Sequence, residues 1–231
     1  MKKFWGFLLV IVLMTSCGEY QSLLKSNDYN LVYKKAIEYY NKGDYQRAMN
    51  LLDGVRSVFV GQAKAQNIAY YRAFCSYNMK DYQIASDLFK QFIQTYPESS
   101  FAEECLYMMG FCDYKASPKP RLDQQVTEKA IREFQLYLSR YPYSMRKDKV
   151  NTYMDEMRDK LSYKAYLSAK NYYLREHYKA AVISLQNCLK DYPGSKYREE
   201  IMYMLFVSKY QMAVNSVEDK KVERYNNARE E

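Results

Sequence analysis

Residues 178–195 read YKAAVISLQNCLKDYPGS, and residues 82–99 read YQIASDLFKQFIQTYPES with the same landmarks at the same spacing. In each stretch an alanine follows the first tyrosine by three residues, and a large apolar residue follows that alanine by four. These steps place the three side chains on one face of an α-helix. A proline twelve residues after the alanine ends the helix, and the serine two residues beyond it predicts the N-cap of the next helix.

Two further copies extend this pattern along the chain. Tyr45 with Ala48 begins one copy, and Ala130 begins another that reaches its proline at Pro142. Small residues that would let two helices cross closely stand twelve positions before three of the alanines, at Ala36, Ala73 and Ala169. In the remaining copy Gly110 takes this role. Each copy therefore predicts a helical hairpin.

The turn inside each hairpin has its own signal. Asp44 and Asp81 directly precede the second helix of two copies, and His177 occupies the same position in a third. Aspartate favours such turns because its side chain can bond to the backbone ahead of it. We therefore predict that His177 is a solvated turn residue.

The order helix, turn, helix, proline, with small residues at the crossing, resembles the tetratricopeptide repeat. This resemblance covers residues 27–231 and implies an all-α superhelix of about five helical hairpins, the last of them incomplete. Residues 115–125 contain two prolines and predict an extended loop, whereas residues 145–174 lack glycine and proline and predict one long helix or two in series. The fifth tyrosine–alanine pair, Tyr225 and Ala228, predicts either a truncated chain or an end that a partner covers.

The first residues predict a targeting segment. Two lysines precede an apolar run of 11 residues at 4–14, which suits a signal-peptide core and is shorter than the roughly 20 residues of a membrane-spanning helix. The sequence that follows, Met-Thr-Ser-Cys-Gly at 14–18, resembles a bacterial lipobox. This resemblance implies cleavage before Cys17 and acylation, including palmitate, of that residue. The alternative is a plain signal peptide cleaved nearby, with Cys17 incidental.

We accordingly expect a lipoprotein signal peptide at 1–16, an acylated tether at 17–26 and the repeat domain at 27–231. Glycine rather than aspartate at position 18 is compatible, in lipoproteins generally, with transfer to the outer membrane. Loss of Lys2 and Lys3 with the signal peptide lowers the formal net charge from +8 to about +6. This basic balance favours anionic headgroups or acidic proteins as contacts, and nucleic acid is not an expected partner of an exported protein.

The composition argues against an enzyme. His177 is the single histidine, which argues against most zinc sites and against any His-dependent triad that needs a second imidazole. The 7 glycines form neither GxGxxG nor GxxxxGK(S/T), the loops that cradle phosphates. Cysteines 75, 105, 112 and 188 contain no CxxC pair, so we predict that they are buried small apolar residues. No metal and no cofactor are expected, apart from the covalent lipid on Cys17.

The 27 tyrosines are organised within the repeats. Five pairs stand seven residues apart, close to two helical turns: 33 and 40, 70 and 77, 107 and 114, 166 and 173, 203 and 210. Aligned along an inner surface, such rings can hold an extended aromatic peptide, and we predict this role for Tyr33, Tyr40, Tyr70 and Tyr77. The alternative is that the rings pack between hairpins.

The middle of the chain resembles the BamD family, the tetratricopeptide-repeat lipoproteins of the outer-membrane β-barrel assembly (BAM) complex. The resemblance lies in DKLSYKAYLSAKNYY at 159–173 and LKDYPGS at 189–195, and LDQQ at 122–125 is similar to a branch of the family. It implies a lipid-anchored scaffold on the periplasmic side of the outer membrane. Its C-terminal repeats would hold the POTRA domains of a BamA-like barrel protein, and its N-terminal repeats would bind β-signals of unfolded outer-membrane proteins.

Two other functions fit the same pattern. One is a repeat lipoprotein scaffold for cell-wall or division machinery, and the other is a glycan-binding lipoprotein of an uptake system. The second would normally need inserted binding loops, for which only residues 115–125 are available.

Overall fold

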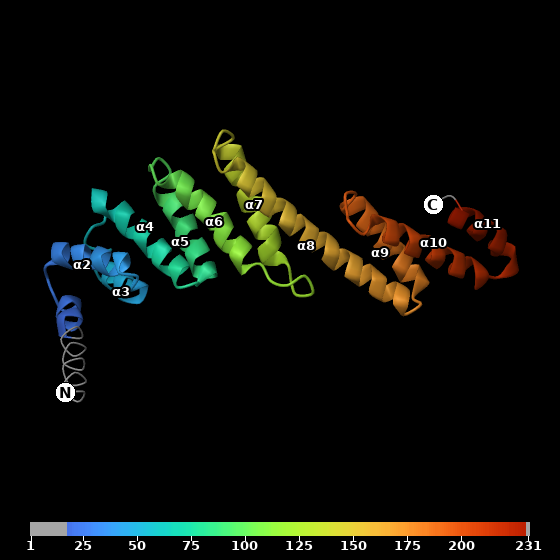
Figure 1. Cartoon of the computed structure of the whole chain (residues 1–231), viewed down its shortest axis with the longest axis horizontal. Coiled ribbons are helices and arrows are strands. Elements are labelled where there is room, and N and C mark those ends of the chain that lie inside the picture. Colours follow the sequence, from blue (N-terminus) through green and yellow to red (C-terminus); the bar gives the residue numbers. More distant parts are fainter. Residues whose placement is uncertain (1–17, 230–231) are drawn as a thin grey trace, which may run out of the picture. The chain divides into compact units, whose positions relative to one another are not determined.

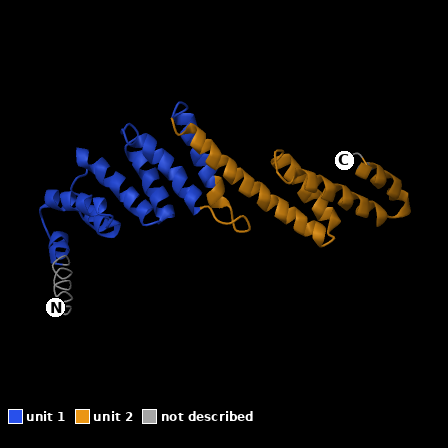
Figure 2. Cartoon of the chain, in the orientation of Figure 1, with its two compact units in different colours: residues 1–116, 129–144 blue, residues 117–128, 145–231 orange. Residues whose placement is uncertain are grey.

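The computed structural model describes residues 18–229, and every regular element in that part of the chain is an α-helix (Figure 1). The all-α prediction is therefore confirmed. Cys17 and the expected signal peptide lie outside the described residues, so lipidation and the boundaries at 16 and 26 stay predictions. The chain forms two compact units (Figure 2). One comprises the chain up to Ala116 with residues 129–144, and the other residues 117–128 with the chain from Met145.

The first unit consists of helices that pack on their neighbours in the chain. After a helical segment at 18–24 come α2 (Tyr29–Asn41), α3 (Tyr45–Val55), α4 (Ala63–Asn78), α5 (Tyr82–Thr95), α6 (Ala102–Ala116) and α7 (Gln125–Arg140), most of which belongs to this unit. The predicted loop between α6 and α7 is confirmed.

The second unit is built on a long helix. Its elements are α8 (Lys147–Leu174), α9 (Tyr178–Asp191), α10 (Arg198–Val214) and α11 (Glu218–Arg229). The predicted helical stretch 145–174 therefore contains one continuous helix, from Lys147 to Leu174, rather than two in series. The loop before α7 is held against α8, because Lys160 Nζ donates to Ser117 Oγ at 2.6 Å and Lys164 Nζ to the carbonyl of Leu122 at 2.7 Å.

The turns α2–α3, α4–α5 and α8–α9 share one backbone conformation. The residue before the N-cap of the second helix has a positive φ, 81° at Gly43, 68° at Lys80 and 60° at Glu176. The next residue is the N-cap, and the Asp44 carboxylate accepts the N–H of Arg47 at 3.2 Å. His177 holds this position before α9 and is exposed, as predicted.

The predicted crossing points are confirmed by complete burial. The small residues and repeat alanines with 0% exposure are Ala36, Ala48, Ala73, Ala85, Ala130, Ala169 and Ala181. At Gly110 a Cβ atom would stand 2.8 Å from Cδ1 of Phe134, so only glycine lets α6 approach α7 this closely. All four cysteines at positions 75 and beyond are buried, which agrees with the prediction that they are core residues.

Both units use the same contact between successive hairpins. Tyr70 donates to Glu104 at 2.8 Å in the first unit, and Tyr166, 96 positions later, donates to Glu200 at 2.7 Å in the second. The ring of Tyr70 lies 4.6 Å from Phe101, and that of Tyr166 lies 4.3 Å from Tyr197.

The expected N-cap role of the Tyr-Pro-x-Ser serine is wrong for α10. The N-cap of this helix is Tyr197, and Ser195 stands two residues earlier, where its hydroxyl accepts the N–H of Tyr197 at 3.3 Å. The same hydroxyl accepts from Ser162 of α8 at 2.8 Å. The serine therefore joins two helices instead of capping one.

Candidate peptide-binding surface

The four predicted peptide-binding tyrosines come from the first helices of two neighbouring hairpins in the first unit. Tyr33 and Tyr40 lie on α2, and Tyr70 and Tyr77 lie on α4. All four rings are half-buried. The two pairs meet through Tyr71, whose ring lies 4.9 Å from Tyr40 and 5.5 Å from Tyr70. The structure therefore brings the two stripes together.

On α2 both tyrosines pack against other aromatic rings, and Tyr33 also lies close to a cation. Tyr33 lies 6.1 Å from Phe59, and the ammonium group of Lys64 stands 5.8 Å from its ring centroid. Tyr40 packs edge-on at 5.5 Å against Tyr45, the first residue of α3. Burial raises the pKa of Tyr33, and raises that of Tyr40 to about 12.

On α4 the rings belong to a larger aromatic cluster. Tyr70 lies 4.5 Å from Phe74, and burial together with the Glu104 hydrogen bond raises its pKa far above the usual value. Tyr77 packs between Phe111 at 6.2 Å and Tyr82 at 5.9 Å. Phenylalanines at 74, 101 and 111 thus complete a surface that the tyrosine spacing alone did not indicate.

The other tyrosine pairs differ in exposure. Tyr107 and Tyr166 are only 7% and 5% exposed, so they are core residues of their hairpins. Tyr203 and Tyr210 on α10 are 63% and 44% exposed, and Phe206 between them is 45% exposed. The seven-residue spacing therefore marks one face of a helix, but what packs on that face differs between repeats.

A buried polar cluster in the first unit has no counterpart in the sequence motifs. Asp113 of α6 is 1% exposed, accepts from Ser86 of α5 at 3.0 Å and pairs with Lys129 of α7 at 2.9 Å. Glu133 lies one turn beyond Lys129, and its nearer carboxylate oxygen stands 3.6 Å from the ammonium. Burial, and next the neighbouring Asp113, raise the pKa of Glu133 to about 8. The members come from three helices, so no local pattern announces them.

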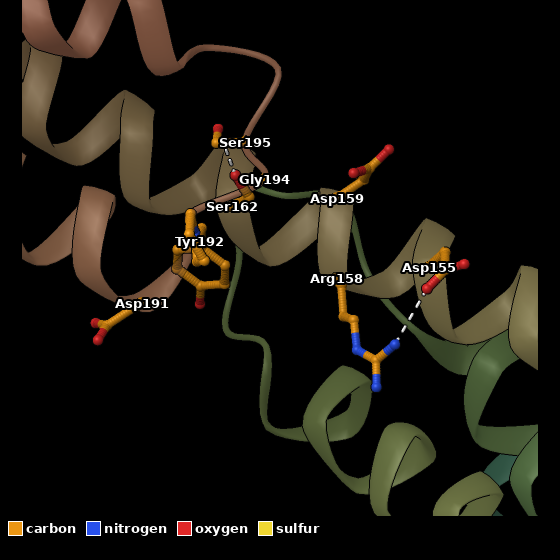
Figure 3. A pocket seen from close by; sticks show the side chains of 9 residues that line it. Asp155, Arg158, Asp159, Ser162, Asp191, Tyr192, Gly194 and Ser195 are labelled. Atoms are coloured by element: carbon orange, nitrogen blue, oxygen red, sulfur yellow. Dashed lines mark hydrogen bonds and ion pairs between the residues drawn. The ribbon is translucent and has the colours of Figure 1, made fainter.

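A pocket of about 420 Å³ lies in the second unit, where the turn after α9 faces α8 (Figure 3). Its polar lining includes the carboxylates of Asp155, Asp159 and Asp191 and the guanidinium of Arg158. Asp155 accepts from Arg158 at 3.1 Å, and Ser162 and Ser195 close the other end (Figure 3). Among residues 18–229 no group of acids, cysteines and histidine has the arrangement of a metal site.

The helices within residues 18–229 do not meet the requirements of a membrane span. None of them is both long enough and apolar enough to cross a bilayer.

The family model YfiO, described as outer membrane lipoprotein, matches residues 25–224 of the chain, which takes in most of both units. A comparison with curated protein sequences gives no match.

Proposed function

Because the chain belongs to the YfiO family of outer membrane lipoproteins, we propose that it is a non-enzymatic scaffold of the β-barrel assembly machinery. The observation that carries this proposal is the family match over 25–224, together with helical hairpins that present aromatic side chains in both units. In this role the protein holds other chains in place and performs no chemistry on them.

The second unit is proposed to dock on the POTRA domains of a BamA-like barrel protein. Exposed aromatic side chains are enriched where proteins bind each other, and α10 presents Tyr203, Phe206 and Tyr210 along one side. Phe206 stacks on Tyr210 at 6.4 Å, and Tyr210 meets Tyr225 of α11 at 5.7 Å. These ring contacts lower the conformational entropy that Phe206 and Tyr210 would lose when a partner binds.

The first unit is proposed to bind the aromatic β-signals of unfolded outer-membrane proteins. Tyr33, Tyr40, Tyr70 and Tyr77 are held by ring contacts on one side and keep part of each ring accessible. A peptide ring that stacks there loses exposed apolar area without having to order the tyrosines first.

Acylation of Cys17 is proposed to anchor both units on the periplasmic face of the outer membrane. Each buried CH₂ of an acyl chain contributes about 0.8 kcal/mol, so several chains on one residue anchor stably where a single chain does not.

The docking proposal is tested by pull-down of the full-length protein from detergent-solubilised outer membrane. We expect a large barrel protein with POTRA domains to co-purify with the wild type and to be lost with Phe206→Glu and Tyr210→Glu. Tyr33→Glu is the matched control in the first unit, and it should retain the barrel protein. Co-purification of cell-wall or division proteins instead would favour the alternative scaffold.

The peptide-binding proposal is tested separately on Tyr40→Ala with Tyr77→Ala. Removal of a contacting ring commonly costs more than about 1 kcal/mol of binding, roughly fivefold in affinity. The phenylalanine variants at the same positions keep the ring packing and control for stability. Unchanged affinity of an aromatic β-signal peptide for the alanine variant, with normal stability, would leave this surface without the proposed role.

A further inference from the structure

A groove of about 360 Å³ lies in the first unit between α5 and α7, with α6 as its floor. Leu106 and Met109 of α6 form the apolar base and are 1% and 5% exposed. Ile93 of α5 and Leu136 of α7 line the sides. Leu136 is 54% exposed, so its side chain is only partly packed in the free protein. The groove thus offers unfilled apolar surface next to an accessible leucine.

The rim of this groove is positively charged. Lys90 of α5 and Arg132 of α7 are exposed, and neither forms an ion pair with any residue in the 18–229 range. Lys129 also lines the groove, but its charge is matched by buried Asp113 at 2.9 Å, with exposed Asp87 3.9 Å away. Glu133, the acid among the described lining residues, stands 3.6 Å from the same ammonium group of Lys129, and burial raises its pKa to about 8, which weakens its negative charge near neutral pH. Two exposed cationic side chains on the rim, Lys90 and Arg132, therefore have no ion-pair partner among the residues that the structure describes.

We propose that this α5–α7 groove binds a segment of a partner protein in which an apolar side chain stands beside acidic residues. The apolar side chain would lie between Ile93 and Leu136 above the α6 floor, and a carboxylate would pair with Lys90 or Arg132. Arginine can receive a carboxylate through two parallel hydrogen bonds, which fixes the segment as well as attracting it. Charge complementarity selects the acidic segment, and the apolar groove gives it a place to anchor.

The dimensions favour a peptide over a lipid. The lining residues on α7 run from Lys129 to Leu136, about 10 Å along the helix axis. This length accommodates one or two side chains and is short for an extended acyl chain. The groove lies between the second helices of its hairpins, whereas the tyrosine surface is built on the first helices α2 and α4. Binding at the groove is therefore independent of the function proposed above.

Peptide display against the full-length protein in detergent micelles tests the inference. Selection should enrich peptides with an apolar residue flanked by aspartate or glutamate, and counter-selection against Leu136→Glu should deplete them. The best peptide should bind Leu136→Glu, and also Lys90→Glu with Arg132→Glu, at least tenfold more weakly than the wild type. Ile84→Glu is the matched control. Ile84 of α5 is 56% exposed, much like Leu136, but it does not line the groove.

Several outcomes would overturn the proposal. These are no enrichment, enrichment of basic or purely apolar peptides, and equal affinity for the wild type and Leu136→Glu. The thermal midpoint of each variant is measured as a control. A midpoint within a few degrees of the wild type shows that the variant is folded, so a weaker affinity reflects the changed side chain. Vesicles that contain phosphatidylglycerol serve as a second probe. If they bind the wild type and lose binding in the groove variants while no acidic peptide binds, the groove is a lipid site.

Discussion

Single residues determine how closely the helices of the first unit approach. Gly110 is the clearest case, because a Cβ atom there would overlap the ring of Phe134, a side chain with no exposed surface. A glycine inside a helix usually costs about 1 kcal/mol relative to alanine, so its presence in α6 has to be offset by packing. The sequence indicated this position through its place in the repeat, whereas the contact with Phe134 required the structure.

Gly110→Ala should therefore destabilise the protein, by about 1–3 kcal/mol, despite the better helix propensity of alanine. Gly54→Ala is the matched control, because Gly54 also lies within a helix, α3, and its Cβ would meet nothing within 4 Å. That change should stabilise by up to about 1 kcal/mol. Denaturant midpoints measure both, and effects of the same sign would contradict the packing described for α6 and α7.

A second residue-scale prediction concerns pH. The folded-state pKa of Glu133 is about 8, above its ordinary value of 4.5, so the folded protein holds a proton that the unfolded chain releases. The free energy of unfolding should therefore fall as pH rises from about 5 to 8, with a slope of at most about 1.4 kcal/mol per pH unit. Glu133→Gln replaces the titrating carboxyl group with an amide. The free energy of unfolding of this variant should therefore depend less on pH between about 5 and 8. If the glutamine variant shows the same slope as the wild type, the pH dependence comes from other groups.

At the scale of elements, the hairpin turns were largely predictable and the contacts between hairpins were not. Asp44 and Asp81 marked the turns, and the repeat alanines marked the crossings, because both signals are local in sequence. The bond from Tyr70 to Glu104 joins residues 34 positions apart, and the Asp113 cluster draws on three helices. Neither pattern can be recognised before the helices are placed. The expected N-cap role of Ser195 fails for the same reason, since its partner Ser162 lies on another helix.

The turns also contain avoidable strain. Lys80 and Glu176 adopt φ angles of 68° and 60°, where Gly43 stands in the corresponding turn of the first hairpin. Non-glycine residues pay about 1–2 kcal/mol for this left-handed conformation, so Lys80→Gly and Glu176→Gly should each stabilise by about 0.5–1 kcal/mol after the entropy of glycine is counted. Lys42→Gly is the control, because Lys42 has an ordinary φ of −82° and should gain nothing. The stabilities of the three glycine variants are compared by thermal unfolding. A stability gain for Lys42→Gly alone would contradict the strain described at Lys80 and Glu176.

At the scale of the whole molecule, the family match and the predicted lipobox concern the same question, how the chain is held at the outer membrane. Cys17→Ala should leave the protein without acyl groups and with its leader uncut at this site, so it should be lost from the outer-membrane fraction. Intact-mass measurement of the purified protein checks this directly. A wild-type protein with a different N-terminus and no acyl mass would refute lipidation at Cys17.

The packing between successive helices has a further consequence for how the protein acquires its structure. The described helices pack mainly on the next helix in the chain, and the recurring tyrosine–glutamate bond reaches only one hairpin ahead. Such topologies have low contact order, which favours rapid folding that can begin at any hairpin and spread to its neighbours. A chain threaded through a secretion channel from its N-terminus would then be able to build each hairpin on the previous one as it emerges, without waiting for its last residues.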